Sequence, residues 1–232
     1  MKTFKTLSRT LRIPLNRRSA LRRLAEFHAR TRSIEEMVEW AMDFGGHGFF
    51  KVQTLQVPAE ITGLAKAVAA LQPRVILEIG TARAGTLLLW ANIASEHVIS
   101  CDLQDMSIQR PLYEAFPGPG SACRVTLLSG DSHSGDFRHR VIQALGGAPV
   151  DFLFIDGDHR EAGVTADYQD YRGLVRPGGL IAFHDIVERQ REPGNEVYQL
   201  WRRLKTEAVT EELIADPAQI GYGIGLVRVP GP

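Results

Sequence analysis

The sequence has little of several features that mark particular classes of protein. Only two cysteines, Cys101 and Cys123, occur in 232 residues, and their spacing does not suggest a metal site. Both fall where we expect strands, so we interpret them as buried thiols in a reducing compartment. No apolar run approaches the roughly 20 residues that cross a bilayer, and the N-terminus lacks the apolar core of a secretory signal. We therefore expect no membrane span and a cytoplasmic location.

Net charge is also absent, because 27 Lys and Arg balance 27 Asp and Glu. The balance hides an uneven distribution. Residues 1–32 hold ten basic side chains and one acid, Glu26, which leaves 17 basic and 26 acidic side chains in the remainder. An acidic body argues against nucleic acid as a partner.

What is present fits one α/β domain with an appendage. The chain is 44% hydrophobic, long enough to bury a sizeable core, and free of internal repeats and low-complexity tracts. We predict a basic helical extension with a lid-like loop over residues 1–57. The main domain then covers residues 58–232.

The basic extension has the pattern of an amphipathic helix. Ser19 is a candidate N-cap for a helix with Leu21, Leu24 and His28 on one face. Such a helix packs on the body of the protein or on a second subunit, which would make a homo-oligomer. The alternative is contact with an anionic membrane or a polyanionic substrate.

Two further helices and a glycine-rich segment precede the first strand. Ser33 and Glu36 form a capping box, which predicts a helix over residues 33–43. The segment Gly45–Phe50 suggests either a loop that closes over a ligand or a buried connector. From Pro58 a helix runs to about Leu71.

Short β-branched runs then alternate with helical stretches, which is typical of right-handed βαβ crossovers in a parallel sheet. We predict strands near 74–79, 97–102, 124–128, 150–156 and 178–184, with Pro177–Gly179 turning into the last of them. The helices between them are expected near 84–95, 107–115, 134–145 and 162–174. After a helix near 194–207, Val209–Ile214 and Tyr222–Arg228 are close enough in sequence to pair as an antiparallel hairpin.

The turn after the first predicted strand is typical of a nucleotide site. The run Val75–Ile79 contains an acid, Glu78, and leads into a turn that opens a helix and is spaced by Gly80 and Gly85. Both glycines let the main chain turn tightly and approach a ligand. Asp102 ends the next apolar run, at the spacing where a carboxylate can accept hydrogen bonds from ribose hydroxyls.

All five predicted strand ends carry acids or histidines. In an open parallel sheet, ligands bind beyond the carboxyl ends of the strands, so these side chains favour a shared site. A single acid, such as Asp131 or Asp158, would by itself be equally well explained as a helix cap. The polar groups that follow the five strands are Glu78 and Gly80, Asp102, Gly130–His133, Asp156–His159, and His184 with Asp185.

These motifs resemble class I S-adenosylmethionine-dependent methyltransferases, in the small-molecule O-methyltransferase-like branch that includes cephalosporin hydroxylase-like proteins. The resemblance covers roughly residues 55–230. It implies a Rossmann-like, mostly parallel seven-stranded sheet with an antiparallel C-terminal hairpin, flanked by helices. It rests on L-E-I-G-T-A-R-A-G at Leu77–Gly85, S-G-D-S at Ser129–Ser132, F-I-D-G-D-H at Phe154–His159 and R-P-G-G-L-I-A-F-H-D at Arg176–Asp185.

The resemblance implies a site for S-adenosylmethionine. Glu78 and Gly80 would frame its methionine end, Asp102 would hold the ribose, and Asp131 with Ser132 would lie near the adenine. Ala82 replaces a glycine that is common in such turns, which disfavours the pyrophosphate of NAD. The full implied set is Glu78, Gly80, Thr81, Ala82, Gly85, Asp102, Leu103, Gly130, Asp131, Ser132 and Asp156.

Metal-assisted relatives hold a divalent ion at positions that match Asp156, His184 and Asp185. Carboxylates suit Mg²⁺, and a histidine in the set moves the preference toward Mn²⁺, Fe²⁺ or Zn²⁺. The alternative is that His184 and Asp185 only make hydrogen bonds and no ion binds.

His159 is the candidate general base, because it lies three residues after Asp156, where catechol-type relatives have a catalytic lysine. Its reference pKa of roughly 6.5 suits neutral pH. The alternative is a histidine that caps the following helix or packs over the cofactor. His133 and His47 are weaker candidates.

The function expected from this resemblance is methyl transfer to an oxygen of a small-molecule acceptor. The acceptor could be a sugar, a polyketide or a phenol. A nicotinamide-dependent oxidoreductase is the enzymatic alternative. A non-catalytic nucleoside-binding scaffold is the alternative from another class.

Overall fold

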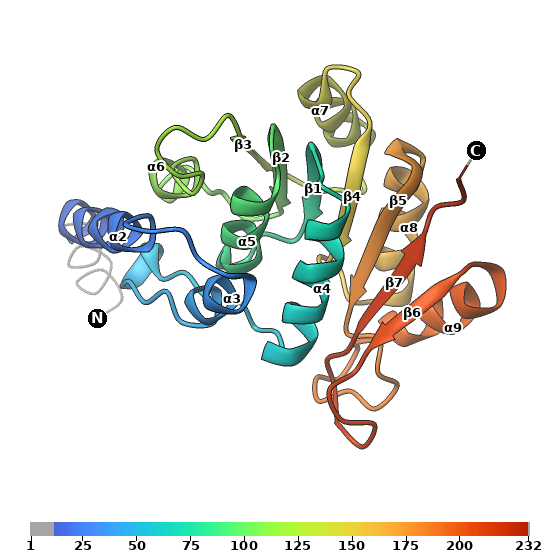
Figure 1. The fold of residues 1–232 in the computed structure, drawn as a ribbon. Helices are drawn as coiled ribbons and strands as arrows, with labels where there is room; N and C mark the ends of the chain where they lie inside the picture. The colour runs from blue at the N-terminus through green and yellow to red at the C-terminus, as the bar shows by residue number, and fades with distance from the viewer. Residues whose placement is uncertain (1–11, 232) are drawn as a thin grey trace, which may run out of the picture.

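One sheet organises the molecule. The computed structural model describes residues 12–231, and its sheet has seven strands in the order β3-β2-β1-β4-β5-β7-β6 (Figure 1). The predicted α/β class and seven-stranded sheet are confirmed. The strands are β1 (Val75–Ile79), β2 (His97–Asp102), β3 (Arg124–Ser129), β4 (Val150–Ile155), β5 (Val175–His184), β6 (Thr210–Leu213) and β7 (Ile224–Arg228).

Strand direction brings the five predicted ends together. Strands β1 to β5 pair in parallel with their neighbours, and β7 runs antiparallel between β5 and β6. The antiparallel C-terminal hairpin is therefore confirmed. Because parallel strands share an orientation, the carboxyl ends of β1 to β5 lie along one edge of the sheet.

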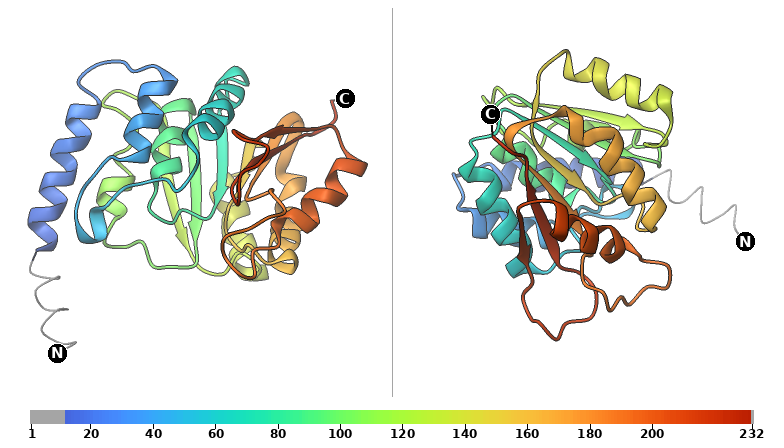
Figure 2. Two further views of the ribbon diagram at one scale, coloured as in Figure 1. Left: turned by 90° about the horizontal axis from the view of Figure 1, so that it is seen from below. Right: turned by 90° about the vertical axis from the view of Figure 1, so that its right-hand side faces the viewer.

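Helices cover both faces of the sheet, because consecutive residues of a buried strand point to opposite faces. In β4, Phe152 and Phe154 pack in one hydrophobic cluster, where both rings meet Trp90 edge-on. Leu153 and Ile155 pack in the other cluster. Figure 2 shows the two layers. The first cluster includes side chains of α4 (Pro58–Ala70) and α5 (Gly85–Ile93), and the second those of α7 (Gly135–Leu145), α8 (Glu161–Tyr171) and α9 (Val197–Glu207).

Two elements differ from their predicted bounds. Strand β5 begins at Val175 and runs through the Pro177–Gly179 segment, which we expected to precede the strand. The register between β4 and β5 shifts there, and a Cβ on Gly179 would lie 2.8 Å from the carbonyl oxygen of Asp151. The segment is thus an irregularity within the strand, of the kind that glycine permits. Helix α6 covers only Arg110–Tyr113, because Pro111 suits a first helical turn.

The N-terminal helix begins earlier than predicted. Helix α2 spans Ile13–Phe27 with Pro14 in its first turn, so Ser19 lies inside the helix and the predicted N-cap was wrong. Proline pre-sets the backbone for a first turn and needs no donor there. Leu24 and Phe27 are buried in the same cluster as side chains of α5. The extension therefore packs on the body through this face.

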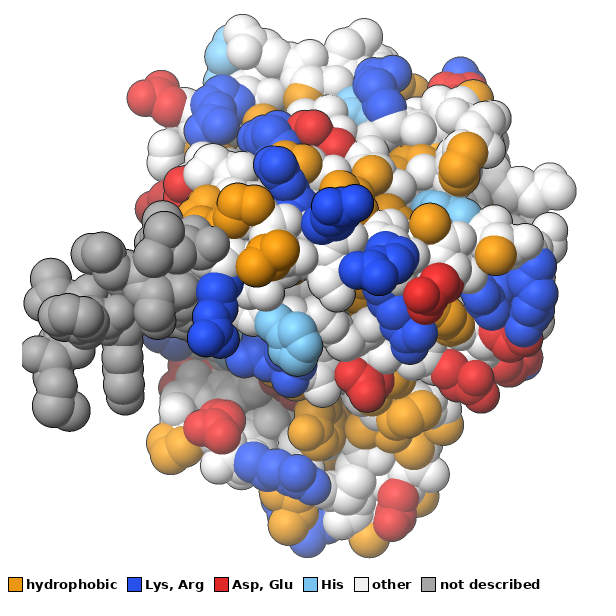
Figure 3. Space-filling view, turned by 90° about the vertical axis from the view of Figure 1, so that its left-hand side faces the viewer, with side chains coloured by type: hydrophobic (Ala, Val, Ile, Leu, Met, Phe, Trp, Pro, Cys, Tyr) orange, Lys and Arg blue, Asp and Glu red, His pale blue; other side chains and the backbone are white. Residues whose placement is uncertain are grey.

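The opposite side of α2 is basic and partly apolar. Figure 3 shows the face of the molecule that carries this helix, where Lys and Arg side chains gather beside hydrophobic ones. Leu15 is 70% exposed on it. The guanidinium group of Arg23 lies 4.2 Å from the ring centre of Trp40 and also pairs with Glu26. Among residues 12–231, no helix has the length and apolar character needed to span a membrane.

Helix α3 (Ile34–Met42) has the predicted capping box, in which the Ser33 side chain and Glu36 bond to each other's backbone N–H groups. In the glycine-rich segment that follows, His47 and Gly48 are exposed, and Phe50 anchors the segment in the core. The segment holds the 3₁₀ turn η1 (Gly48–Phe50), and both Phe44 and Phe50 are fully buried. Residues 53–56, further along the chain, reach the sheet edge instead.

Candidate active site

Two cavities lie over the edge where β1 to β5 end. The β3-side cavity has a volume of about 600 Å³ and lies over the ends of β1, β2 and β3. The β5-side cavity has a volume of about 450 Å³ and lies between residues 53–56 and the segments that follow β5 and precede β7. The residues that line both are Gly80, Ala82, Asp156, Gly157 and His159. The predicted strand-end site is therefore a pair of adjoining cavities.

The predicted cofactor residues divide between these cavities. Eight line the β3-side cavity, namely Gly80, Ala82, Asp102, Leu103, Gly130, Asp131, Ser132 and Asp156. Thr81 and Gly85 line the β5-side cavity instead. Glu78 lines neither.

Glu78 supports the turn from beneath. It is fully buried, and its carboxylate accepts hydrogen bonds from the indole N–H of Trp90, at 2.9 Å, and from the hydroxyl of Ser100. Burial raises the pKa of Glu78 to about 7. Ser100 in turn lies 2.6 Å from the hydroxyl of Thr81. The structure thus places this acid under the turn that we expected it to flank at the ligand.

The glycines of the turn serve contacts within the protein. A Cβ on Gly80 would lie 2.0 Å from the carbonyl oxygen of Asp156, and one on Gly85 would lie 2.1 Å from the backbone nitrogen of Thr54. Both are impossible contacts. We expected these glycines to allow a tight turn and the approach of a ligand; in the structure they let two other segments of main chain approach the turn.

Asp102 holds the same turn from the end of β2. Its Oδ2 accepts from the backbone N–H of Ala82, at 2.7 Å, and its Oδ1 from that of Gln104, at 2.8 Å. Ala82 has a positive φ of 45°, which is unusual for a residue with a Cβ. Each carboxylate oxygen has a second acceptor position, so Asp102 can still bind ligand hydroxyls.

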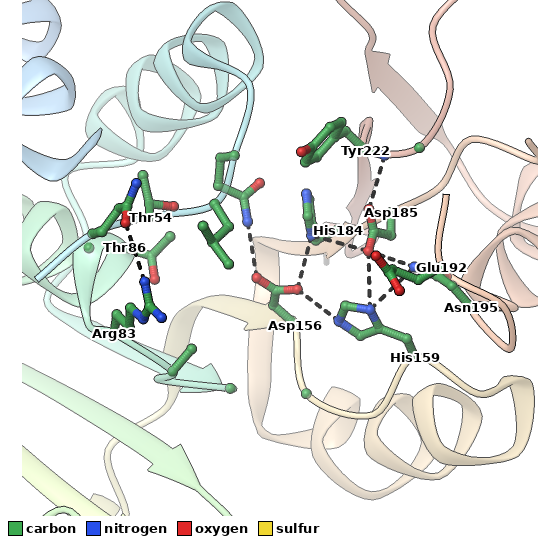
Figure 4. A pocket seen from close by; sticks show the side chains of 18 of the residues that line it. Thr54, Arg83, Thr86, Asp156, His159, His184, Asp185, Glu192, Asn195 and Tyr222 are labelled. Carbon is green, nitrogen blue, oxygen red and sulfur yellow. Dashed lines mark hydrogen bonds and ion pairs between the residues drawn. The ribbon is translucent and has the colours of Figure 1, made fainter. Parts of the chain in front are cut away.

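Asp156 is the centre of a polar network at the end of β4 (Figure 4). Its Oδ1 lies 3.2 Å from Nε2 of His159 and 3.0 Å from Nδ1 of His184, and its Oδ2 accepts from the amide nitrogen of Gln56 at 3.0 Å. Burial opposes the charged carboxylate, but the positive charge of His184 and the hydrogen bond from His159 prevail and hold the pKa of Asp156 well below its usual range.

His159 bridges two carboxylates. Besides Asp156, its Nδ1 lies 3.1 Å from Oδ2 of Asp185. Hydrogen bonds to Asp156 and then Asp185 raise the pKa of His159 to about 10, although burial acts in the other direction. From sequence we expected the ordinary pKa of an imidazole for His159. In this arrangement the ring is protonated at neutral pH, because both of its nitrogens face acceptors.

Asp185 is held by residues that the sequence analysis missed. The backbone N–H of Tyr222 donates to its Oδ1 at 3.0 Å, and the Asn195 side chain donates to its Oδ2 at 2.6 Å. Asp185 and Tyr222 both have φ near +60°, a strained conformation that is common at functional sites. Asn195 and Gln56 lie in loops, where sequence gives no periodic signal that could have identified them.

The residues at this junction fit a divalent metal. Asp156, His159 and His184 each offer a ligand atom, and the three atoms lie within 4.8 Å of one another. His184 donates from Nδ1 to Asp156, while its buried Nε2 has no hydrogen-bond partner among the described residues. Metal binding would release the Nε2 proton of this ring, which leaves the tautomer that is typical of metal-binding histidines. Asp185, which we expected as the third ligand, is outside this group.

The two weaker candidates for the general base, His133 and His47, lie in different parts of the structure. His133 lines the β3-side cavity, and its Nε2 lies 3.3 Å from Oδ1 of the buried Asp167. His47 precedes η1 and lines neither cavity.

Comparisons with known proteins concern the domain and its fold. Residues 77–186 match a family model described as a methyltransferase domain. The O-methyltransferase TomG from Streptomyces achromogenes, solved in complex with SAM, is 18% identical with a TM-score of 0.58, over 87% of this chain and 92% of that chain. An O-methyltransferase from Bacillus cereus, in complex with SAH, is 19% identical with a TM-score of 0.57, over 86% of this chain and 92% of that chain.

A third similar structure contains a metal. The MycE methyltransferase from the mycinamycin biosynthetic pathway, in complex with Mg, SAH and mycinamycin VI, is 16% identical with a TM-score of 0.56. The match covers 87% of this chain and 56% of that one. These matches do not support a nicotinamide-dependent oxidoreductase or a non-catalytic scaffold. Residues 77–186 thus match a methyltransferase domain, and the chain has the Rossmann-like fold of these similar structures.

Proposed function

We propose that this methyltransferase transfers the methyl group of S-adenosylmethionine to a hydroxyl oxygen of a small molecule. The observation that carries the proposal is the meeting of two cavities at Asp156 and His159. A reaction between two bound molecules needs two adjoining sites, with the reacting groups held at their junction.

S-adenosylmethionine would occupy the β3-side cavity. Asp102 would accept hydrogen bonds from the ribose, and Asp131 with Ser132 would lie near the adenine, since all three line this cavity. Its methyl group would then point toward the shared residues. The SAM and SAH complexes of similar folds support this assignment.

The acceptor would occupy the β5-side cavity. Its oxygen attacks the methyl carbon in line with the departing sulfur, the sulfonium sulfur takes the bonding electron pair, and the hydroxyl proton passes to a base. We propose His159 as that base. Because the ring holds a proton in the arrangement described, its pKa must fall first. The positive sulfonium of a bound cofactor acts in that direction.

A divalent ion would be held by Asp156 and His184, with Asp185 as a further ligand, which leaves His159 free to act as the base. Mg²⁺ and Mn²⁺ suit such a mixed set, and the MycE complex with Mg supports an ion in this fold. When bound, the ion would stabilise negative charge on the acceptor oxygen.

Titration calorimetry with S-adenosylhomocysteine and with NAD tests the cofactor. We expect binding of the first and not of the second, and binding of NAD alone would refute the proposal. Incubation with labelled S-adenosylmethionine and a cell extract, followed by mass spectrometry, then tests transfer. One metabolite should gain a single methyl group on oxygen.

Three further expectations remain proposals. They are the division of the chain at residue 57, the cytoplasmic location and a homo-oligomer formed through the N-terminal helices.

A further inference from the structure

Two buried polar atoms at the β5-side cavity lack partners among the described residues. They are Oε1 of Gln56 and Nε2 of His184. The two residues are only 6% and 5% exposed. Buried polar groups in folded proteins are nearly always hydrogen-bonded, so two such atoms on one cavity point to a ligand that satisfies them.

The orientation of the Gln56 amide follows from its neighbour. Its other end, Nε2, donates to Oδ2 of Asp156 at 3.0 Å. A carboxylate only accepts, so the opposite orientation would put two acceptors in contact. Oε1 is therefore the free end. An amide oxygen cannot donate, so the missing partner must supply an O–H or N–H group.

The backbone just before Gln56 is held by hydrogen bonds to two other segments, so the Gln56 side chain projects from a fixed position. The N–H of Gln53 donates to Arg83, and that of Thr54 donates to Ala41 at 2.7 Å. The close approach of Gly85 to Thr54 holds the same segment against the turn after β1. A site of this kind distinguishes ligands by geometry.

The carboxylate of Asp156 lies between Gln56 and the two histidines, and each side contacts a different oxygen of it. Gln56 contacts Oδ2, whereas His159 and His184 contact Oδ1. One ligand in this cavity could therefore place one hydroxyl beside the histidines and another at Gln56.

The rest of the lining suits a polyhydroxylated ligand. Four carboxamides line this cavity, from Gln53, Gln56, Gln190 and Asn195. Each carboxamide can donate and accept, as a hydroxyl does, and so pairs with it in either direction. Tyr222 and the exposed Leu55 supply apolar surface for the ring face of such a molecule.

We propose that Gln56 determines acceptor specificity by accepting a hydrogen bond from a second hydroxyl of the acceptor, apart from the one that is methylated. The acceptor class is then a polyhydroxylated aliphatic molecule, such as a sugar. This inference rests on the proposed function.

Pairs of probes that differ by one hydroxyl test it. Transfer from labelled S-adenosylmethionine is measured for vicinal cyclohexanediol against cyclohexanol, and for methyl glucoside against its deoxy analogues. We expect the wild-type protein to favour the compound with the additional hydroxyl in at least one pair, by about tenfold or more in kcat/KM. The compound without that hydroxyl would leave Oε1 of Gln56 without a hydrogen-bond donor. Gln56→Met, which keeps the volume and removes the acceptor, should reduce that preference to within about twofold.

Gln199→Met is the matched control, since Gln199 lies on α9 and lines neither cavity. It should keep the full preference. A role of Gln56 only in holding Asp156 would slow both members of a pair equally. Equal transfer to both members in the wild type, no transfer to any probe, or an unchanged preference in Gln56→Met would each overturn the inference.

Calorimetry with S-adenosylhomocysteine on all three proteins separates the two levels of the argument. If the wild type does not bind it, the proposed function fails. If all three bind it equally while no preference is found, the fold of the variants is intact and only the role of Gln56 is rejected.

Discussion

His159 follows Asp156 by three residues, and a 3.2 Å contact joins Nε2 of the ring to Oδ1 of the carboxylate at the junction of two cavities. Asp185 holds the other ring nitrogen, at 3.1 Å. A histidine fixed at both nitrogens has a defined position and orientation. That arrangement places a proton-transfer group where acceptor and cofactor would meet.

His159→Ala should lower kcat by about 10²- to 10⁴-fold, the usual contribution of a positioned acid–base group. Affinity for S-adenosylhomocysteine should change little, because the ring lies at the edge of the β3-side cavity. Steady-state transfer assays and calorimetry measure the two effects. A variant with wild-type kcat would show that the ring serves only to orient Asp156 and Asp185.

Asp102→Ala should weaken binding of S-adenosylhomocysteine by about 1.5–3 kcal/mol, the value of hydrogen bonds to a charged group. Part of the loss would come from the turn, since Asp102 also accepts from the backbone of Ala82. Asp136→Ala, in the first turn of α7, is a control that should bind normally. Unchanged affinity in Asp102→Ala would place the ribose elsewhere.

Polar residues at the carboxyl ends of the strands are the part of the site that could be predicted from sequence. Apolar runs with one polar terminus, such as the run that ends at Asp102, located the sheet edge, and parallel pairing then brought the termini together. Contacts between segments distant in sequence had no such signal. Gln56 meets Asp156 across 100 residues, and Gly85 is required by Thr54 rather than by a ligand.

The surroundings of individual side chains also could not be predicted from sequence. The reference pKa of histidine says nothing of a ring placed between two carboxylates, and Glu78 appears in the sequence as part of the turn although Trp90 and Ser100 cover it. Ser19 fitted the composition of an N-cap, but α2 begins at Ile13 with Pro14 in its first turn, so Ser19 lies inside the helix. Pro14 was the local signal of the true start.

Metal binding can be tested one ligand at a time. Equilibrium dialysis with Mn²⁺ should give one ion per wild-type chain and none for His184→Ala, because Nε2 of His184 has no hydrogen-bond partner among the described residues and is thus free to bind an ion. Asp185→Asn should lower the affinity more than His159→Ala if Asp185 is the third ligand and His159 the base. The reverse order would place His159 among the ligands, and retention of the ion by His184→Ala would exclude this site.

The buried Glu78 should make stability depend on pH. Its pKa is raised from 4.5 to about 7 in the folded protein because burial penalises the charge. Between these values the folded state keeps a proton that the unfolded state has released, so stability falls as pH rises through this window. Below 4.5 both states are protonated, and above about 7 both are ionised and the loss is complete. At 1.36 kcal/mol per pKa unit the loss is on the order of 3 kcal/mol.

Glu78→Gln removes this titration while preserving shape. The Gln amide can accept from Trp90 and donate to the Ser100 hydroxyl, as the protonated acid does. Urea unfolding at several pH values from about 4.5 to 8 gives the free energy of unfolding of both proteins. The difference between them isolates Glu78, because other titrating groups are common to both. We expect the free energy of unfolding of the wild type to fall steadily relative to that of Glu78→Gln across this window. A difference that stays constant with pH would mean that Glu78 is ionised throughout.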